Sequence, residues 1–154
     1  MIKASISGAE RARFKAWTRT LTVENRAEVI YIVRKHTFDM QRLSKLKADK
    51  PLFKEVTGRL RSSIIYQFSP NGLGSTVRVE VDYAPHVEFG TRPHTILPKR
   101  GRFLAFKPSG SNKYVFARKV EHPGSPPKPF FYNTWEQVQK NFINDLRKLG
   151  FKEA

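Results

Sequence analysis

The apolar residues of this chain follow a helical period at both ends. Near the N-terminus, Phe14 and Trp17 recur at the spacing of one helix face. A longer helix is predicted over residues 24–47. Its apolar side comprises Ala27, Ile30, Tyr31, Val33 and Phe38. A third helix is predicted near the C-terminus, with Asn133 and Glu136 as its N-cap signature and a glycine as its stop. Its apolar stripe comprises Trp135, Val138, Phe142, Leu146 and Leu149.

A strand period replaces the helical one in the middle of the chain. Residues 64–68 are β-branched and aromatic, and a turn signal around Asn71-Gly72 follows them. The next run alternates two sets of residues, Val77, Val79 and Val81 on one face and Arg78, Glu80 and Asp82 on the other. Together the two runs predict a β-hairpin. Two further short strands are predicted at residues 103–106 and 114–120.

These patterns predict an α+β fold in a single domain that spans residues 1–154. The N-terminal helices take residues 1–50, and the C-terminal helix takes residues 130–150. Between them, residues 57–120 are expected to form an antiparallel sheet of about four strands, packed against the helices. A long loop over residues 91–102 protrudes from the sheet. It is rich in basic residues and has no Asp or Glu, and loops beyond about 12 residues are usually functional or disordered.

The stretch Tyr83–Thr91 connects the hairpin to this loop. A proline near its start removes one backbone donor, and a glycine stands near its end. We expect a kinked edge strand from which the loop departs. As a strand, it places Val87 and Phe89 on the core. The alternate residues, His86 and Glu88, then face outward toward a partner chain.

The charge balance indicates a polyanionic partner. The 154 residues include 29 Lys or Arg and 13 Asp or Glu, for a net charge of +16. Such an imbalance favours nucleic acid, a membrane surface or an acidic protein. No apolar run approaches the roughly 20 residues that span a bilayer, so no membrane partner is expected. The absence of Cys excludes disulfides and thiolate metal sites, and it is typical of a reducing cytoplasm.

Candidate chemistry is sparse along the chain. His86, Glu88, His94 and His122 are the residues from which a metal-dependent hydrolase could be built. Their spacing matches no compact ligand motif, and no glycine-rich phosphate loop links a strand to a helix. We therefore expect a protein that is not an enzyme, with no catalytic residues, no metal and no cofactor. The metal-dependent hydrolase stays an alternative, as does a stand-alone basic DNA-binding module that contacts the DNA backbone without reading bases.

Three segments of the chain together resemble a known family. They are residues 57–64 (TGRLRSSI), 83–91 (YAPHVEFGT) and 122–130 (HPGSPPKPF). In order and spacing they resemble the small head–tail connector, neck or tail-completion proteins of long-tailed bacteriophages and prophages. The second segment is the most specific of the three. The resemblance covers residues 24–149.

The resemblance implies a non-enzymatic minor structural protein of the virion, assembled in the host cytoplasm. It would form a homo-oligomeric ring at the head–tail joint, sixfold or alternatively twelvefold. Double-stranded viral DNA would pass through the ring and be contacted without sequence specificity. Head-closure or adaptor proteins would lie on one side, and tail-terminator or tail-tube proteins on the other.

Three groups of site residues follow from the resemblance and from the basic loop. The interface between protomers of the ring would comprise Tyr83, His86, Glu88, Phe89 and Thr91. The loop that contacts an adjacent ring or the DNA would present Arg92, His94, Lys99, Arg100 and Arg102. The turn of the first segment comprises Gly58, Arg59 and Arg61.

Overall fold

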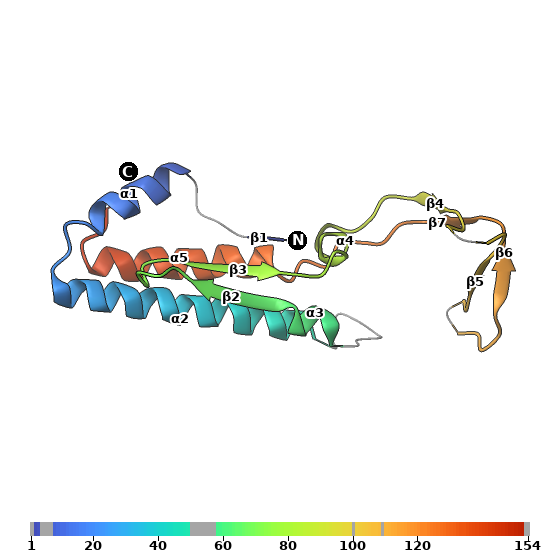
Figure 1. Ribbon diagram of the computed structural model, residues 1–154, viewed down its shortest axis with the longest axis horizontal. Helices are drawn as coiled ribbons and strands as arrows, with labels where there is room; N and C mark the ends of the chain where they lie inside the picture. Colours follow the sequence, from blue (N-terminus) through green and yellow to red (C-terminus); the bar gives the residue numbers. More distant parts are fainter. Residues whose placement is uncertain (1, 4–7, 50–57, 100, 109, 153–154) are drawn as a thin grey trace.

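In the computed structural model, a helical body occupies one end of the molecule and a narrow β arm the other (Figure 1). The arm, defined as residues 91–125, leaves the body and returns to it at the same place. The structure describes residues 2–3, 8–49, 58–99, 101–108 and 110–152. Thr57 and Arg100, both named in the sequence predictions, lie outside these residues.

Helices α2 (Val23–Lys47) and α5 (Tyr132–Lys148) run antiparallel along the body (Figure 1). α2 begins where the Thr22 side chain accepts a hydrogen bond from the Asn25 amide. Both long helices were predicted, but the predicted apolar side of α2 is wrong in part. Val33 is buried and Ile30 packs against buried residues, whereas Ala27, Tyr31 and Phe38 are exposed. The buried face includes Val29, Ile32 and Met40 instead, because α2 carries apolar residues on more than one side. The predicted stripe of α5 is confirmed by five side chains that are buried or packed against buried residues, namely Trp135, Val138, Phe142, Leu146 and Leu149.

The sheet of the body has three strands in the order β1 (Ile2–Lys3), β3 (Ser75–Val79) and β2 (Ile64–Phe68). β2 and β3 form the predicted hairpin, with Ile64 opposite Val79 in an antiparallel ladder. The predicted alternation holds because one face packs on α2 and the other meets solvent. The packed face buries Val77 and Val79, and Val81 just beyond the strand is buried as well.

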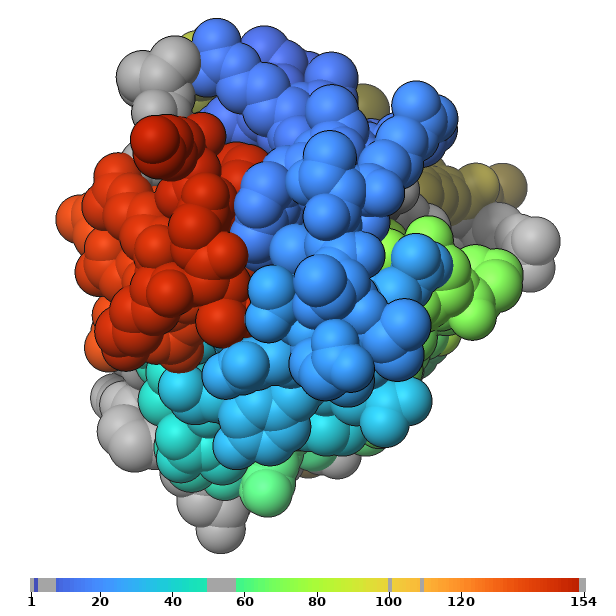
Figure 2. Space-filling view, turned by 90° about the vertical axis from the view of Figure 1, so that its left-hand side faces the viewer, coloured from blue at the N-terminus to red at the C-terminus, as the bar shows by residue number. Residues whose placement is uncertain are grey.

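Two clusters of apolar side chains fill the body. The first lies between the sheet, α2 and the start of α5, and it includes Met40, Ile64, Val79, Phe130 and Phe131. The second joins α1 (Gly8–Trp17) to α2 and to the end of α5. In it, the Phe151 ring lies 5.3 Å from the Trp17 ring and 6.1 Å from the Phe14 ring, centre to centre. Figure 2 shows this end of the molecule, where the blue N-terminal helices lie directly against the red end of α5.

Helix α5 ends as the sequence predicts but begins differently. The Phe151 amide donates to the Leu146 carbonyl at 3.2 Å, and Gly150 has a φ of 91°, which together form a Schellman cap. At the other end, the first helical residue is Tyr132. Asn133 therefore lies inside the first turn, and the prediction that it caps the helix is wrong. The acceptor for the first amides has to come from elsewhere in the chain.

The arm consists of two short antiparallel ribbons. Near the body, β4 (His94–Ile96) pairs with β7 (Val120–His122); farther out, β5 (Leu104–Phe106) pairs with β6 (Val115–Ala117). The predicted α+β class, with antiparallel strands between terminal helical regions, is confirmed. The strands of the described residues are divided among three sheets, however, and the last two predicted strands lie in the arm. An alternating pattern specifies a strand but not its partner, so residues 91–102 are one leg of an arm and not an isolated loop.

The prediction of an edge strand at Tyr83–Thr91 is wrong. Residues Ala84–Phe89 form the short helix α4, with the proline in its first turn, where the missing amide breaks no helical hydrogen bond. The helical period places Ala84 and Glu88 on one buried side. Phe89, expected in the core, is 61% exposed. The error came from reading a two-residue period where a period of 3.6 residues applies.

Asp145 on α5 ties the two long helices together. Its carboxylate lies 2.9 Å from Lys35 Nζ and 2.9 Å from His36 Nε2 on α2, and 2.8 Å from Lys148 Nζ on its own helix. The hydrogen bond from Lys148, followed by those from Lys35 and His36, holds the pKa of Asp145 well below its usual range. Asp145 in turn raises the pKa of Lys35. The folded state therefore favours the charged forms of this pair.

Asp145→Asn is expected to lower the free energy of unfolding by about 1–2 kcal/mol at pH 7. The folded-state pKa lies below the unfolded value of about 4, so the stabilisation is present above that pH and is lost as the pH falls. Urea titrations should show that the difference in free energy of unfolding between wild type and variant is smaller at pH 3 than at pH 7. Asp39→Asn, at an exposed carboxylate 3.5 Å from Arg42, is the control and should change little. A gap that is equal at both pH values would contradict this role for Asp145.

Candidate functional site: the arm and its base

A single carboxylate joins helix α4, where the arm begins, to helix α5. Glu88 Oε2 accepts hydrogen bonds from the amides of Phe130 at 2.9 Å and Phe131 at 3.0 Å, and Oε1 accepts one from Tyr132 at 2.8 Å. These amides stand at the N-terminus of α5, where helical amides lack partners within the helix. The helix dipole also favours an anion at this end. Glu88 thus supplies the cap that the residues around Phe131 do not.

The burial of Glu88 corrects its predicted orientation. Its side chain is 2% exposed, so it does not face a partner chain as the strand interpretation required. A carboxylate is buried at acceptable cost only when hydrogen bonds replace its water, and three backbone amides do so here. The available signal was a carboxylate between the apolar residues Val87 and Phe89. Its partners lie 42 to 44 residues later, beyond the reach of a local pattern.

Backbone hydrogen bonds and two glycines set the direction in which the arm leaves the body. The Thr91 amide donates to the Ser125 carbonyl at 3.0 Å, and the Ser125 amide donates to the Thr91 carbonyl at 3.1 Å. Gly90 and Gly124 have φ values of 73° and 87°, and a Cβ at either one would lie within 2.4 Å of a carbonyl oxygen across this bridge. Both positions therefore require glycine. These four residues form the arm base, where the second and third segments of the family resemblance meet.

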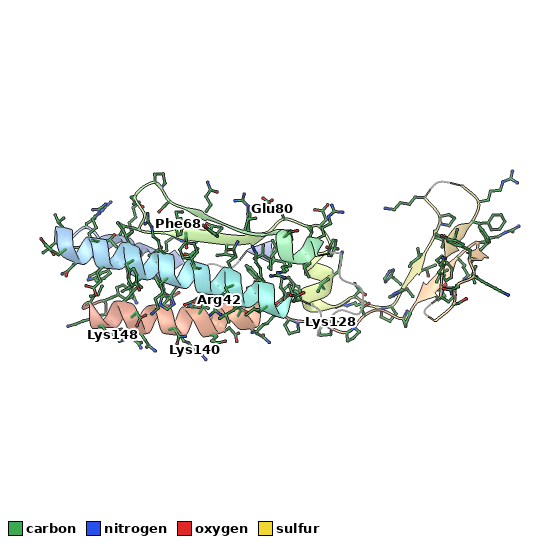
Figure 3. All side chains as sticks on the ribbon, turned by 90° about the horizontal axis from the view of Figure 1, so that it is seen from below. Arg42, Phe68, Glu80, Lys128, Lys140 and Lys148 are labelled. Atoms are coloured by element: carbon green, nitrogen blue, oxygen red, sulfur yellow. The ribbon has the colours of Figure 1, made fainter. Side chains whose placement is uncertain are left out.

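The described part of the arm contains no buried residue. Its sequence has eight Lys or Arg residues and one acidic residue, Glu121. Hydrogen bonds from Thr95 at 2.6 Å and Lys119 at 3.2 Å lower the pKa of Glu121, so its charge persists but offsets little of the total. Figure 3 shows the arm side chains projecting on both sides of the ribbons, away from α2 and α5. The arm is therefore a cationic extension, and its described residues form no core of their own.

The residues predicted to contact an adjacent ring or DNA lie along the first leg of the arm. Arg92, His94, Lys99 and Arg102 are all exposed there. His94 stacks on His122 across the β4–β7 ribbon, with ring centres 5.1 Å apart, and its Nδ1 lies 2.9 Å from the Arg92 carbonyl oxygen. The structure thus brings these residues together along one leg of the arm, and their contacts with another molecule stay a prediction.

The other predicted interface residues lie close to the arm base. Tyr83, His86 and Phe89 are exposed, and the Phe89 ring lies 5.6 Å from the Tyr132 ring. Thr91 belongs to the bridge itself, and its hydroxyl oxygen is buried with no hydrogen-bond partner among the described atoms. Their role between protomers stays a prediction.

The first segment of the resemblance forms the short helix α3 (Arg59–Ser62) before β2. Gly58 precedes it with a φ of 71°, which an L side chain rarely adopts. Leu60 is buried in the first core cluster, and Arg61 pairs with Asp49 at 3.0 Å, while Arg59 is exposed. The segment therefore fixes how the chain enters the hairpin.

The metal-dependent hydrolase has no site in the part of the chain that the structure describes. Glu88 is occupied by three amides, whereas His94 and His122 stack on each other in the arm. Nowhere in the described ranges do three or more His, Asp or Glu side chains gather closely enough to hold a metal ion. Among the same residues, every helix is too short or too polar to cross a bilayer.

Comparison with known proteins assigns no family to the chain. No family model matches it, and neither the curated proteins nor the solved structures include one that is detectably similar. The resemblance to phage neck proteins therefore rests on the three segments alone.

Replacing Glu88 with Ala is expected to lower the free energy of unfolding by about 3 kcal/mol, because three amides at the start of α5 lose their acceptor. Glu88→Gln keeps a neutral oxygen acceptor and should cost less. Glu80→Ala is the matched control, since its half-exposed carboxylate pairs with Arg78 at 3.1 Å and should contribute below about 1 kcal/mol. Urea denaturation followed by circular dichroism measures all three. A Glu88→Ala variant as stable as Glu80→Ala would exclude the capping role.

Gly124→Ala is expected to open the arm base. Gly101→Ala is the control, because both glycines have positive φ, which costs about 1–2 kcal/mol for other residues, but an added Cβ meets nothing within 4 Å at Gly101. At Gly124 it meets the Thr91 carbonyl oxygen at 2.3 Å. Amide hydrogen exchange at Thr91 and Ser125 should accelerate by about tenfold or more in Gly124→Ala only. The same exchange rates in both variants would count against a tightly fitted arm base.

Proposed function

We propose that the protein is a minor structural protein of a tailed-phage virion, located at the joint between head and tail. It would form a homo-oligomeric ring, sixfold in preference to twelvefold, around the channel for double-stranded DNA. Head-closure or adaptor proteins and tail-terminator or tail-tube proteins would be its neighbours. The three segments at residues 57–64, 83–91 and 122–130 are the reason for choosing this class. The arm base supports the choice, because the second and third segments hold each other there through Glu88 and the Thr91–Ser125 bridge.

The main observation in support of a ring is the exposed apolar side of the outer ribbon, β5–β6. On one face of β5–β6, Leu104 lies opposite Ala117 and Phe106 lies opposite Val115. These four residues form an apolar face, on which Phe106 and Val115 are 36% and 41% exposed. A two-stranded ribbon with nothing packed behind it is only marginally stable in water. This face therefore needs a partner to cover it.

A second copy of the chain is the partner that suits the apolar face. The arm base holds the arm away from its own body, as Figure 1 shows, so the body of the same chain does not cover the ribbon. An arm that docks on the body of the next copy uses two different surfaces. A heterologous contact of this kind generates a ring when its rotation closes and an open helical filament when it does not. The net charge of +16 per copy would then surround the DNA, which favours contact without sequence specificity.

A double variant, Phe106→Ser with Val115→Ser, tests the ring contact. Class averages of the wild-type protein by electron microscopy should show closed rings of one symmetry. The double variant should remain monomeric, since each truncated anchor weakens association by about tenfold. Val23→Ser, at an 81% exposed position on α2, is the control and should still assemble. A wild-type chain that is monomeric at every concentration and is missing from mature particles by mass spectrometry would overturn the proposal.

A further inference from the structure

The second face of the β5–β6 ribbon combines aromatic and basic side chains. Ala105 lies opposite Phe116 in the ladder, and both project to the side away from the apolar face. The same alternation, continued by one residue beyond each strand end, adds two aromatic and two basic residues. The resulting aromatic–cationic face comprises Phe103, Lys107, Tyr114, Phe116 and Arg118.

Cations and rings are paired across the two strands on this face. Arg118 Cζ lies 5.8 Å from the centre of the Phe103 ring, and Lys107 Nζ lies 4.8 Å from the centre of the Tyr114 ring. Phe116 has only the small Ala105 opposite it, and it is 69% exposed. Phe103 and Tyr114 are 50% and 63% exposed. Three rings thus stand open to solvent beside two positive charges.

Stability of the arm does not account for these rings. A cation over an exposed ring contributes only about 0.5–1 kcal/mol, and no core lies behind the ribbon for the rings to fill. Grouped exposed aromatic residues mark a contact surface. Because the arm has eight basic residues and a single acidic one, and Lys107 and Arg118 lie on this face, an anionic partner is favoured here. The face fits an anionic partner that presents flat apolar surfaces.

We propose that the aromatic–cationic face binds single-stranded nucleic acid. Unpaired bases stack on aromatic rings whatever their sequence, and sheets that bind single strands stack two or three bases on such rings. Lys107 and Arg118 are placed beside the rings to meet phosphates. In a duplex the flat faces of the bases are hidden within the stack, so the rings contribute nothing to duplex binding. This activity goes beyond the ring proposed above and does not depend on it.

Fluorescence anisotropy on the full chain tests the proposal. The probes are labelled oligothymidylate, the same strand paired with oligoadenylate, and poly-glutamate, all of equal length and at equal salt. The single strand should bind most tightly. Phe116→Ala and Tyr114→Ala should each weaken single-strand affinity by about tenfold and leave duplex affinity unchanged. Leu97→Ala, at a 62% exposed position on the arm outside this face, is the control and should bind as wild type does.

Two further variants separate stacking from folding and from charge. Phe116→Leu keeps an apolar residue in the strand but removes the flat ring, and it should weaken single-strand binding about as much as Phe116→Ala. Lys107→Gln should reduce the slope of log affinity against log salt by about 0.7, whereas the ring variants should leave the slope unchanged.

Several outcomes would overturn the inference. Equal affinity for single strand and duplex, unaffected by the ring variants, would show binding by charge alone. Tighter binding of poly-glutamate would identify an acidic protein as the partner, and no binding at low salt would remove the site. Repeating the titration with the Phe106→Ser, Val115→Ser variant keeps the two proposals apart. A chain that no longer assembles should still bind the single strand.

Discussion

The buried carboxylate of Glu88 is the interaction on which the arrangement of the molecule depends. By accepting three amides at the start of α5, it fixes α4 against the C-terminal helix, and α4 is where the chain turns out of the body. The same contact places Phe130 and Phe131 in the first core cluster. A shorter side chain at this position would leave helix amides unpaired inside the protein, which is more costly than losing a surface contact. The first core cluster, the start of α5 and the direction of the arm therefore all depend on the Glu88 carboxylate.

The arm base fixes the direction in which the whole arm leaves the body. Gly90 and Gly124 let the two legs of the arm approach until their backbones pair at Thr91 and Ser125. The legs therefore leave the body together and in one direction. Beyond this point the arm buries nothing within its described residues, so its outer ribbon gains no stability from its own body. Its exposed apolar and aromatic residues are the ones that the proposed contacts with other molecules would cover.

Local periodicity was sufficient for much of the fold. The stripe of α5, the length of α2 and the β2–β3 hairpin follow from side-chain spacing, because each of these elements buries one face against another element of the body. Other features escaped it. Spacing did not separate the exposed Tyr31 and Phe38 of α2 from the buried Val29 and Ile32, because α2 carries apolar residues on more than one side. Tyr83–Thr91 is too short to separate a period of 2 from one of 3.6, and its deciding contact lies with amides more than 40 residues away. The arm strands alternate like core strands, but alternation does not say whether a sheet has a body behind it.

The two faces of the β5–β6 ribbon are compatible with different partners at the same time. Side chains of alternate residues point to opposite sides of a strand, so a protein that covers Phe106 and Val115 leaves Phe116 and its neighbours uncovered. None of the four residues of the apolar face carries a charge. The opposite face carries Lys107 and Arg118, and its field reaches only about 8 Å at physiological salt. In the proposed ring, copies that carry +16 each would repel one another unless anions intervene, so a polyanion bound on the cationic side would stabilise the proposed assembly.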